Sequence, residues 1–211
     1  DEAAQIISHM LCPHPNETIL DACAGLGGKT GHIAQLMKNT GKILAIDKDN
    51  EKLAKLAGEM KRLQVSNVKV RQMTLDMENH QQLPEFFDRV LLDAPCSGLG
   101  VIRRNPDIKW AINKKDLTRF AKRQHAYLDM LSRNVAPGGL LLYSVCTTEP
   151  EETDAVIEIF LKNHPEFKML SDKSDLPVSL QTIVNDSGIF KSLPHIHPMD
   201  GFFAARLKRH S

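Results

Sequence analysis

Two cysteines are the residues of this sequence whose types and spacing most clearly suggest chemistry. Cys96 follows the apolar run 87–93 as Asp93-Ala-Pro-Cys96, and Cys146 ends the apolar run 139–146. A cysteine thiolate is a nucleophile that can attack an electrophilic carbon in a ligand cleft. One cysteine at such a position is more often a small buried apolar residue. Two cysteines that close two predicted strands indicate a cleft with paired thiols.

A glycine-rich segment is the second candidate site. It reads Asp21-Ala-Cys-Ala-Gly25-Leu-Gly-Gly-Lys29-Thr30 and overlaps the end of the apolar run 18–23. Glycines after a strand let the backbone approach a ligand and lead into the N-terminus of a helix. The spacing matches neither G-x-G-x-x-G nor the Walker A loop. A turn with only a packing role is the alternative.

Acidic residues end or follow the other predicted strands. Asp47 ends the run 42–47, where a carboxylate can accept hydrogen bonds from the ribose of NAD or of S-adenosylmethionine equally well. Asp76 follows the run 68–73 and suits either an adenine edge or a turn. Asp93 ends the run 87–93. Ligands of open α/β sheets bind outside the carboxyl ends of the strands, which is where these groups are expected.

The elements that must position these residues alternate along the chain. We predict strands at 18–23, 42–47, 68–73, 87–93 and 139–146, and helices at 27–37, 50–63, 115–134 and 150–163. Such alternation, with strands apolar on both faces, predicts a doubly wound, mostly parallel α/β sheet. The run 200–207 predicts a late strand, with antiparallel pairing as one option. We expect 172–198 to be an ordered surface excursion.

The overall composition excludes several classes of protein. The 211 residues suit a single catalytic domain, and no apolar run is long enough to cross a membrane. The first residues do not resemble a signal peptide. The four cysteines form no C-x-x-C pair, so neither a zinc site nor a disulfide framework is expected. We therefore expect no metal, a reduced cytoplasmic compartment and a monomer.

One segment is strongly basic although the formal net charge of the chain is only +1. Residues 101–125 contain only Asp107 and Asp116 as acids. The basic side chains include Arg103, Arg104, Lys109, Arg119 and Arg123. A segment of this charge can face the phosphates of a nucleic acid, or it can be a solvated helix face. Trp110 lies within it and suits either stacking on a base or anchoring in the core.

The sequence resembles the Sun/Fmu family of RNA cytosine-5 methyltransferases. The resemblance rests on the glycine-rich segment, on Asp93-Ala-Pro-Cys-Ser-Gly98, on Tyr143-Ser-Val-Cys-Thr147 and on Asp200-Gly-Phe-Phe-Ala-Ala-Arg206. It covers nearly the whole chain, and the paired cysteine motifs are specific. One departure is Gly25-Leu26, where family members usually have Ala-Pro. The departure leaves the backbone donors of the loop in place.

The resemblance implies a seven-stranded Rossmann-like fold and S-adenosylmethionine as the cofactor. It implies that the cofactor's methionine portion is held by the loop residues Cys23, Ala24, Gly25, Leu26, Gly27, Gly28 and Lys29. Asp47 would bind the ribose, Asp76 the adenine, and Asp93 both the cofactor amine and the cytosine. RNA phosphates would be held by Lys29, Arg103, Arg104, Lys109, Arg119 and Arg123. Within the family the chain resembles most the bacterial members that modify 16S ribosomal RNA, which usually carry a further N-terminal RNA-binding region.

The resemblance also implies a covalent mechanism. Cys146 would be the nucleophile that adds to carbon 6 of cytosine, and Cys96 would assist product release. Asp93, held protonated in a dry pocket, is a candidate to protonate the ring nitrogen. The alternatives are a transfer RNA cytosine-5 methyltransferase, a non-catalytic RNA-binding assembly factor on the same fold, and an NAD-dependent dehydrogenase.

Overall fold

The structure is a computed structural model that describes residues 1–76, 82–84 and 86–210. The strands are β1 Thr18–Ala22, β2 Lys42–Asp47, β3 Val68–Gln72, β4 Phe87–Asp93, β5 Val135–Val145, β6 Phe167–Met169, β7 Ile189–Ser192 and β8 Phe202–Arg209. The α-helices are α1 Glu2–Met10, α2 Gly28–Leu36, α3 Asn50–Arg62, α4 Ile108–Ala111, α5 Lys114–Ser132, α6 Asp154–Asn163 and α7 Val178–Gln181. Two short 3₁₀ helices are η2 Leu99–Val101 and η3 Pro150–Glu152.

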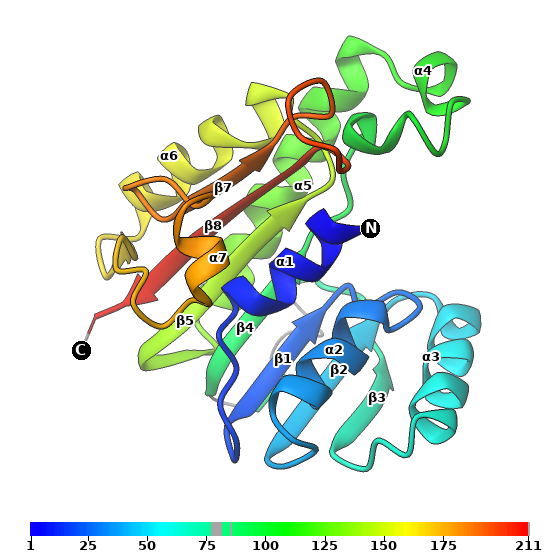
Figure 1. Cartoon of the computed structure of the whole chain (residues 1–211), viewed down its shortest axis with the longest axis vertical. Coiled ribbons are helices and arrows are strands. Elements are labelled where there is room, and N and C mark those ends of the chain that lie inside the picture. The colour runs from blue at the N-terminus through cyan, green and yellow to red at the C-terminus, as the bar shows by residue number, and fades with distance from the viewer. Residues whose placement is uncertain (77–81, 85, 211) are drawn as a thin grey trace.

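The strands form one mixed sheet in the order β3-β2-β1-β4-β5-β8-β6, with β7 also paired to β8 (Figure 1). Strands β1 to β5 are parallel, and β8 is antiparallel to β5, β6 and β7. The predicted doubly wound α/β class is therefore confirmed. The described part of the chain has an 8-stranded sheet rather than a seven-stranded one. The reason is that β6 and β7 are two short strands that share one edge of β8.

Helices cover both faces of the sheet because alternate strand residues are apolar on both sides. Ile19 of β1 belongs to a core cluster with residues of α1, α2 and α7. Leu20, its neighbour, belongs to the opposite cluster with residues of α5 and α6. Figure 1 shows α1 and α2 together on one face, with the short helix α4 beyond the ends of β4 and β5. No helix in the residues described is long and apolar enough to span a membrane.

Polar caps define where the two longest helices begin. Asp49 accepts hydrogen bonds from the backbone amides of Glu51 and Lys52, which starts α3 directly after β2. Asn113 and Asp116 form a reciprocal capping box at the start of α5. These caps fix the crossovers that return the chain to the sheet, and so bring the carboxyl ends of β1, β2, β4 and β5 to one edge.

Three sequence predictions differ from the structure. Strand β5 begins at Val135 rather than at 139, because Gly138 adopts φ +73° at a bulge in its pairing with β4. The predicted helix 150–163 is divided at Thr153 into η3 and α6. The excursion 172–198 is not only superficial, because its helix α7 and strand β7 bury side chains against the same core as α1.

Candidate active site

The loop between β1 and α2 has a backbone that few residue types allow. Cys23, Gly25 and Gly27 adopt φ of +63°, +57° and +84°. A side chain at Gly27 would collide with Leu56 of α3, so this glycine is required by both torsion and space. The backbone amide of Gly25 donates to Asp47 Oδ2 at 2.9 Å, which ties the loop to the end of β2.

One cavity of about 350 Å³ opens at the strand ends, and we call it the strand-end cavity. The residues that line it include Asp47, Cys23, Gly25 and Asp93. Its apolar lining is formed by Ile46, Met73, Leu75, Ala94 and Pro95, with Tyr127. A flat aromatic base suits the apolar walls. Each oxygen of Asp47 accepts one backbone amide and keeps a lone pair for a hydroxyl.

Asp76 does not line the strand-end cavity. It borders a neighbouring hollow together with Leu75 and Tyr127, two residues that also line the strand-end cavity. The structure therefore brings Asp47 and Asp93 together in the strand-end cavity and places Asp76 in the neighbouring hollow.

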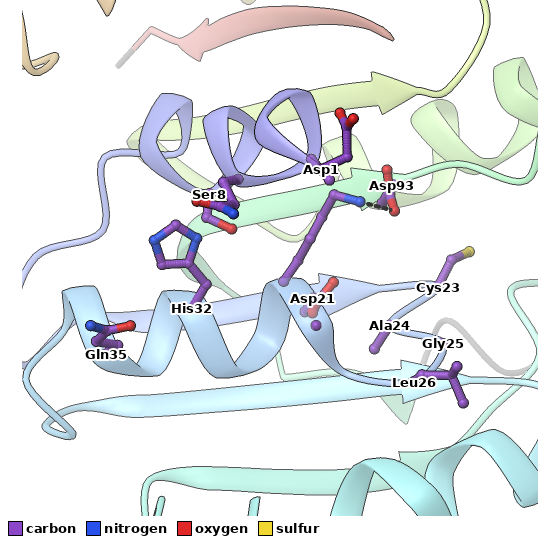
Figure 2. A pocket seen from close by; sticks show the side chains of 14 residues that line it. Asp1, Ser8, Asp21, Cys23, Ala24, Gly25, Leu26, His32, Gln35 and Asp93 are labelled. Carbon is purple, nitrogen blue, oxygen red and sulfur yellow. Dashed lines mark hydrogen bonds and ion pairs between the residues drawn. The ribbon is translucent and has the colours of Figure 1, made fainter. Parts of the chain in front are cut away.

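A second cavity of about 560 Å³ lies between α1 and α2, on the other side of the loop, and we call it the loop cavity (Figure 2). Cys23, Gly25 and Asp93 line both cavities, so the two meet at the loop. Ser8 of α1 and His32 of α2 face one another across it in Figure 2. The loop cavity is therefore a second open space beside the carboxyl ends of β1 and β4.

Lys29 and Asp93 form an ion pair between the two cavities. Lys29 Nζ lies 2.6 Å from Asp93 Oδ2, marked by the dashed line in Figure 2. Burial alone would lower the pKa of Lys29, but the Asp93 carboxylate raises it, and the net shift is upward. The Asp93 side chain is 29% exposed. Asp93 is therefore paired with a cation at a partly exposed position, and its role as the group that protonates the ring nitrogen stays a prediction.

The two cysteines meet as the sequence predicts. Cys96 Sγ and Cys146 Sγ are 3.4 Å apart, and both side chains are only partly buried. The hydrogen bond from Cys96 lowers the pKa of Cys146, against burial and the Asp93 charge, which raise it; Lys29 contributes a further lowering. The hydrogen bond to Cys146, followed by burial, raises the pKa of Cys96 well above its usual value. Cys146 is thus the more acidic thiol of the pair and Cys96 the less acidic one.

The sequence matches one known protein family over most of its length. The family description "16S rRNA methyltransferase RsmB/F" matches residues 8–208. The chain belongs to this RsmB/F family. Family membership sets aside the dehydrogenase alternative, and the structural neighbours of the chain are S-adenosylmethionine-dependent methyltransferases.

The similar proteins are longer than this chain. A "Probable ribosomal RNA small subunit methyltransferase B" of Synechocystis sp. is 41% identical over 209 residues, which are 99% of this chain and 47% of that protein. A human "28S rRNA (cytosine(4447)-C(5))-methyltransferase" is 38% identical over 95% of this chain and 26% of its own. The structure of NSun6 from Pyrococcus horikoshii with SFG, an S-adenosylmethionine analogue, matches with a TM-score of 0.84 and 32% identity, over 99% of this chain and 52% of that one. The chain spans about half the length of the bacterial relative.

The basic residues of this family member separate into two groups. Arg103 Nε donates to Asp200 Oδ1 at 2.6 Å, Arg103 also pairs with Asp1, and Arg104 pairs with the second oxygen of Asp200. Asp200 is fully buried, so these two arginines hold the start of β8. Lys29 is likewise engaged at Asp93. The geometry gives these three cations structural or catalytic partners within the chain.

Of the other predicted RNA-binding residues, Lys109 and Arg119 are exposed and Arg123 is half-buried. Lys109 Nζ lies 5.1 Å from the ring centre of Trp110, and Arg119 and Arg123 lie over the ring of Phe120. Trp110 is 83% exposed, so the alternative that it anchors the core is wrong. These side chains form an exposed basic and aromatic surface on α4 and α5.

Sequence reasoning missed several residues of the site. Asp21 accepts from the Thr30 hydroxyl at 2.6 Å, and its burial raises its pKa to about 7. Glu152 and Gln124 are fully buried and contact the turn that carries Cys96. Acidic residues near a helix start look solvent-exposed in a sequence, so the only signal was the closeness of Glu152 to Cys146. Within the described residues no three His, Cys, Asp or Glu side chains are gathered as ligands for a metal.

Proposed function

We propose that this chain is the catalytic domain of an S-adenosylmethionine-dependent RNA cytosine-5 methyltransferase that acts on small-subunit ribosomal RNA. Its family and the names of its relatives support the reaction and the substrate class. The observation that carries the mechanism is the pair of thiols 3.4 Å apart beside the Lys29–Asp93 ion pair. The proposal includes action as a monomer in the cytoplasm, where thiols stay reduced.

The residues present fit the cofactor. The loop lets its backbone approach a ligand closely at Gly25 and Gly27, which carry no side chains. The strand-end cavity offers apolar walls for adenine, and Asp47 offers acceptors for ribose hydroxyls. S-adenosylmethionine would supply an activated methyl group. Cys23 contributes to the shape of the site rather than to its reactivity, because burial raises the pKa of its thiol.

Cys146 would activate the cytosine. Carbon 5 of cytosine is a weak nucleophile until a thiolate adds to carbon 6 and moves an electron pair into the ring. The new Sγ–carbon bond forms at carbon 6, and the displaced electron pair is neutralised by a proton at ring nitrogen 3. Lys29 Nζ lies 2.6 Å from Asp93 Oδ2 and can pass a proton to it. The Asp93 carboxyl group would then give that proton to ring nitrogen 3.

Cys96 would complete the reaction. After carbon 5 has gained the methyl group, it still carries its original proton. Cys96, as a thiolate, accepts that proton, the double bond between carbons 5 and 6 re-forms, and the bond from carbon 6 to Cys146 breaks. Ring nitrogen 3 returns its proton to the Lys29–Asp93 pair, which leaves neutral 5-methylcytosine and a Cys146 thiolate. The main reason for the high pKa of Cys96 is its hydrogen bond to Cys146. Bonding of Cys146 to the substrate removes that cause, so Cys96 loses its own proton more easily at the stage when it must act as a base.

The surface of α4 and α5 would hold the RNA. A single-stranded or flipped-out base is required, because carbon 6 is not accessible in a stacked duplex. Lys109 and Arg119 supply exposed cations for phosphates, with the half-buried Arg123 beside them. Trp110 supplies a ring on which a neighbouring base can stack. Ile108 of α4 packs close to Gly98, so this surface lies next to the turn that carries Cys96.

The test is a denaturing gel of the Cys96→Ala variant with labelled small-subunit ribosomal RNA and S-adenosylmethionine. We expect a slowly migrating covalent adduct that disappears when Cys146→Ser is added. Transfer RNA in a parallel lane tests the alternative substrate. If Cys146→Ser alone methylates RNA at a near-normal rate, Cys146 is not the nucleophile. RNA binding without methylation or adduct in any variant would favour the non-catalytic assembly factor.

A further inference from the structure

A buried carboxylate holds the backbone next to Cys96. Glu152 of η3 is fully buried, and its Oε1 and Oε2 accept from the Ser97 backbone amide at 3.0 and 3.3 Å. Ser97 directly follows Cys96. A buried carboxylate that accepts a backbone amide fixes that peptide strongly, because the bond is charge-assisted.

The same carboxylate also holds the residue before Cys96, through a second side chain. Gln124 of α5 donates from Nε2 to Glu152 Oε1 at 2.9 Å and to the Pro95 carbonyl oxygen at 3.1 Å. Gln124 is fully buried as well. The Glu152–Gln124 pair therefore grips the turn Pro95–Ser97 on both sides of the thiol.

Further bonds connect this turn to the end of β5, which carries Cys146. The hydroxyl groups of Ser97 and Thr147 are 3.1 Å apart, and Thr147 directly follows Cys146. Tyr143 OH donates to the backbone carbonyl of Glu152 at 2.7 Å. The separation of 3.4 Å between the two sulfur atoms is thus set by one hydrogen-bonded network.

Glu152 is a buried carboxylate that has no cationic partner among the residues that the structure describes. Burial of a carboxylate without a cation is costly. Its negative charge also contributes to the raised pKa of Cys96, after the hydrogen bond to Cys146, burial and the charge of Cys146. A costly buried charge aimed at the turn of a reactive thiol suggests a role in the reaction.

We propose that Glu152 is a positioning residue that, with Gln124, holds the turn Pro95–Ser97 so that Cys96 Sγ can reach the substrate carbon next to the one bonded to Cys146. This inference rests on the proposed function. Cys146 directly follows β5 and keeps its place when the turn relaxes, so attack at carbon 6 still occurs. Proton removal by the displaced Cys96 then fails, and the covalent adduct persists.

Three variants separate the contributions. Glu152→Gln keeps the length of the side chain and removes its charge, whereas Glu152→Asp keeps the charge and shortens the reach to Ser97. Glu151→Gln is the matched control, because Glu151 lies beside Glu152 in η3 and its side chain is exposed. We expect Glu152→Gln and Glu152→Asp to lower turnover by about 10²-fold, the usual size of a lost proton transfer. Both should accumulate adduct on the denaturing gel, as Cys96→Ala does, while Glu151→Gln matches the parent.

The outcomes distinguish this inference from the proposed function. Normal turnover without adduct in both Glu152 variants overturns the positioning role. Loss of adduct in the Glu152 variants, with adduct retained in Cys96→Ala, also overturns it, because Glu152 would then act on the fold or on Cys146. Absence of adduct in Cys96→Ala itself refutes the two-cysteine mechanism instead.

An RNA-free measurement keeps the inference testable if the adduct assay fails or Glu152 variants unfold. Gln124→Met removes the bond to Pro95 but keeps a buried side chain of similar length. Its melting curve reports folding, and the pH dependence of iodoacetamide alkylation at Cys146 reports the distance to Cys96. We expect the alkylation midpoint to rise toward that of Cys96→Ala in folded Gln124→Met and Glu152→Gln. An unchanged midpoint in both overturns the proposed grip on the turn.

Discussion

The backbone amide of Gly100 donates to the carbonyl oxygen of Cys146 at 3.0 Å. The carbonyl of Gly100 in turn accepts from the Gly201 amide at 2.8 Å. Three segments that are far apart in the sequence are joined at this point: the turn after Cys96, the end of β5 and the start of β8. The contact explains why glycine occupies both positions 100 and 201, since a side chain at either Gly100 or Gly201 would push the segments apart.

Replacement of Gly100 by alanine should disrupt this junction. A Cβ there would collide with the carbonyl group of Gly201, which is backbone and cannot move aside. We expect Gly100→Ala to lower the free energy of unfolding by about 2–4 kcal/mol, as overpacking of buried sites does, and to displace Cys146. Urea unfolding followed by circular dichroism measures the loss. Gly58→Ala, on the exposed side of α3 with open space around it, is the control and should stabilise by about 0.5–1 kcal/mol. Equal effects of the two substitutions would contradict the role of Gly100.

The acidity of Cys146 should respond in opposite directions to its two neighbours. Cys96 lowers the pKa of Cys146 by donating a hydrogen bond to the thiolate, whereas the Asp93 charge raises it. Cys96→Ala should therefore shift the alkylation midpoint of Cys146 to higher pH, and Asp93→Asn should shift it to lower pH. Peptide mapping by mass spectrometry isolates Cys146 from Cys12, whose pKa burial raises to about 12. Shifts of the same sign would contradict this account of the pair.

The sequence predicted the parts of the fold and the site that depend on local patterns. Apolar runs with an acid or a cysteine at the end located β1, β2, β4 and β5, and parallel pairing then required those ends to share one edge. The late strand could be placed, but its antiparallel direction became certain only from its pairing with β5. Strands as short as β6 and β7 have too few residues to show a period, and they exist because β8 offers them an edge.

The parts that escaped prediction depend on contacts between distant residues. The charge of Arg103 and Arg104 predicted contacts with phosphates, which stay a prediction, and the fold adds that both exposed side chains pair with the buried Asp200. Glu152 has the sequence surroundings of an exposed helix start, yet η3 turns it inward to the Cys96 turn. The pairing of Asp93 with Lys29 was not predicted, because the two residues are 64 positions apart in the chain. Burial and pairing of charges are tertiary properties, and local patterns do not encode them.

The buried Asp21 should make stability depend on pH. Burial raises its pKa from 3.8 to about 7 in the folded chain. The folded state therefore keeps a proton that the unfolded chain releases, and this contribution to stability is complete below about pH 4 and is lost as pH rises through about 7. Asp21→Asn should remove this slope, so that the variant gains about 1–3 kcal/mol relative to the parent between pH 5 and pH 8. Urea midpoints at several pH values test this. A difference that stays constant across that range would show that Asp21 is ionised in the folded chain throughout.

Arg119 and Arg103 should report different functions although both belong to the same basic segment. Arg119 lies on the exposed surface of α5, and among the residues that the structure describes its ion pair is with the nearby Asp116, so its loss should change stability by less than about 0.5 kcal/mol. If it contacts a phosphate of single-stranded RNA, Arg119→Ala should lower the slope of log affinity against log salt concentration by about 0.7. Arg103→Ala should leave that slope unchanged and cost about 1–3 kcal/mol of folding free energy, because it removes partners of Asp1 and of the buried Asp200. RNA-binding titrations at several salt concentrations and urea unfolding measure both effects. If the salt slope falls in Arg103→Ala and stays unchanged in Arg119→Ala, the RNA contacts Arg103 rather than the surface of α5 around Arg119.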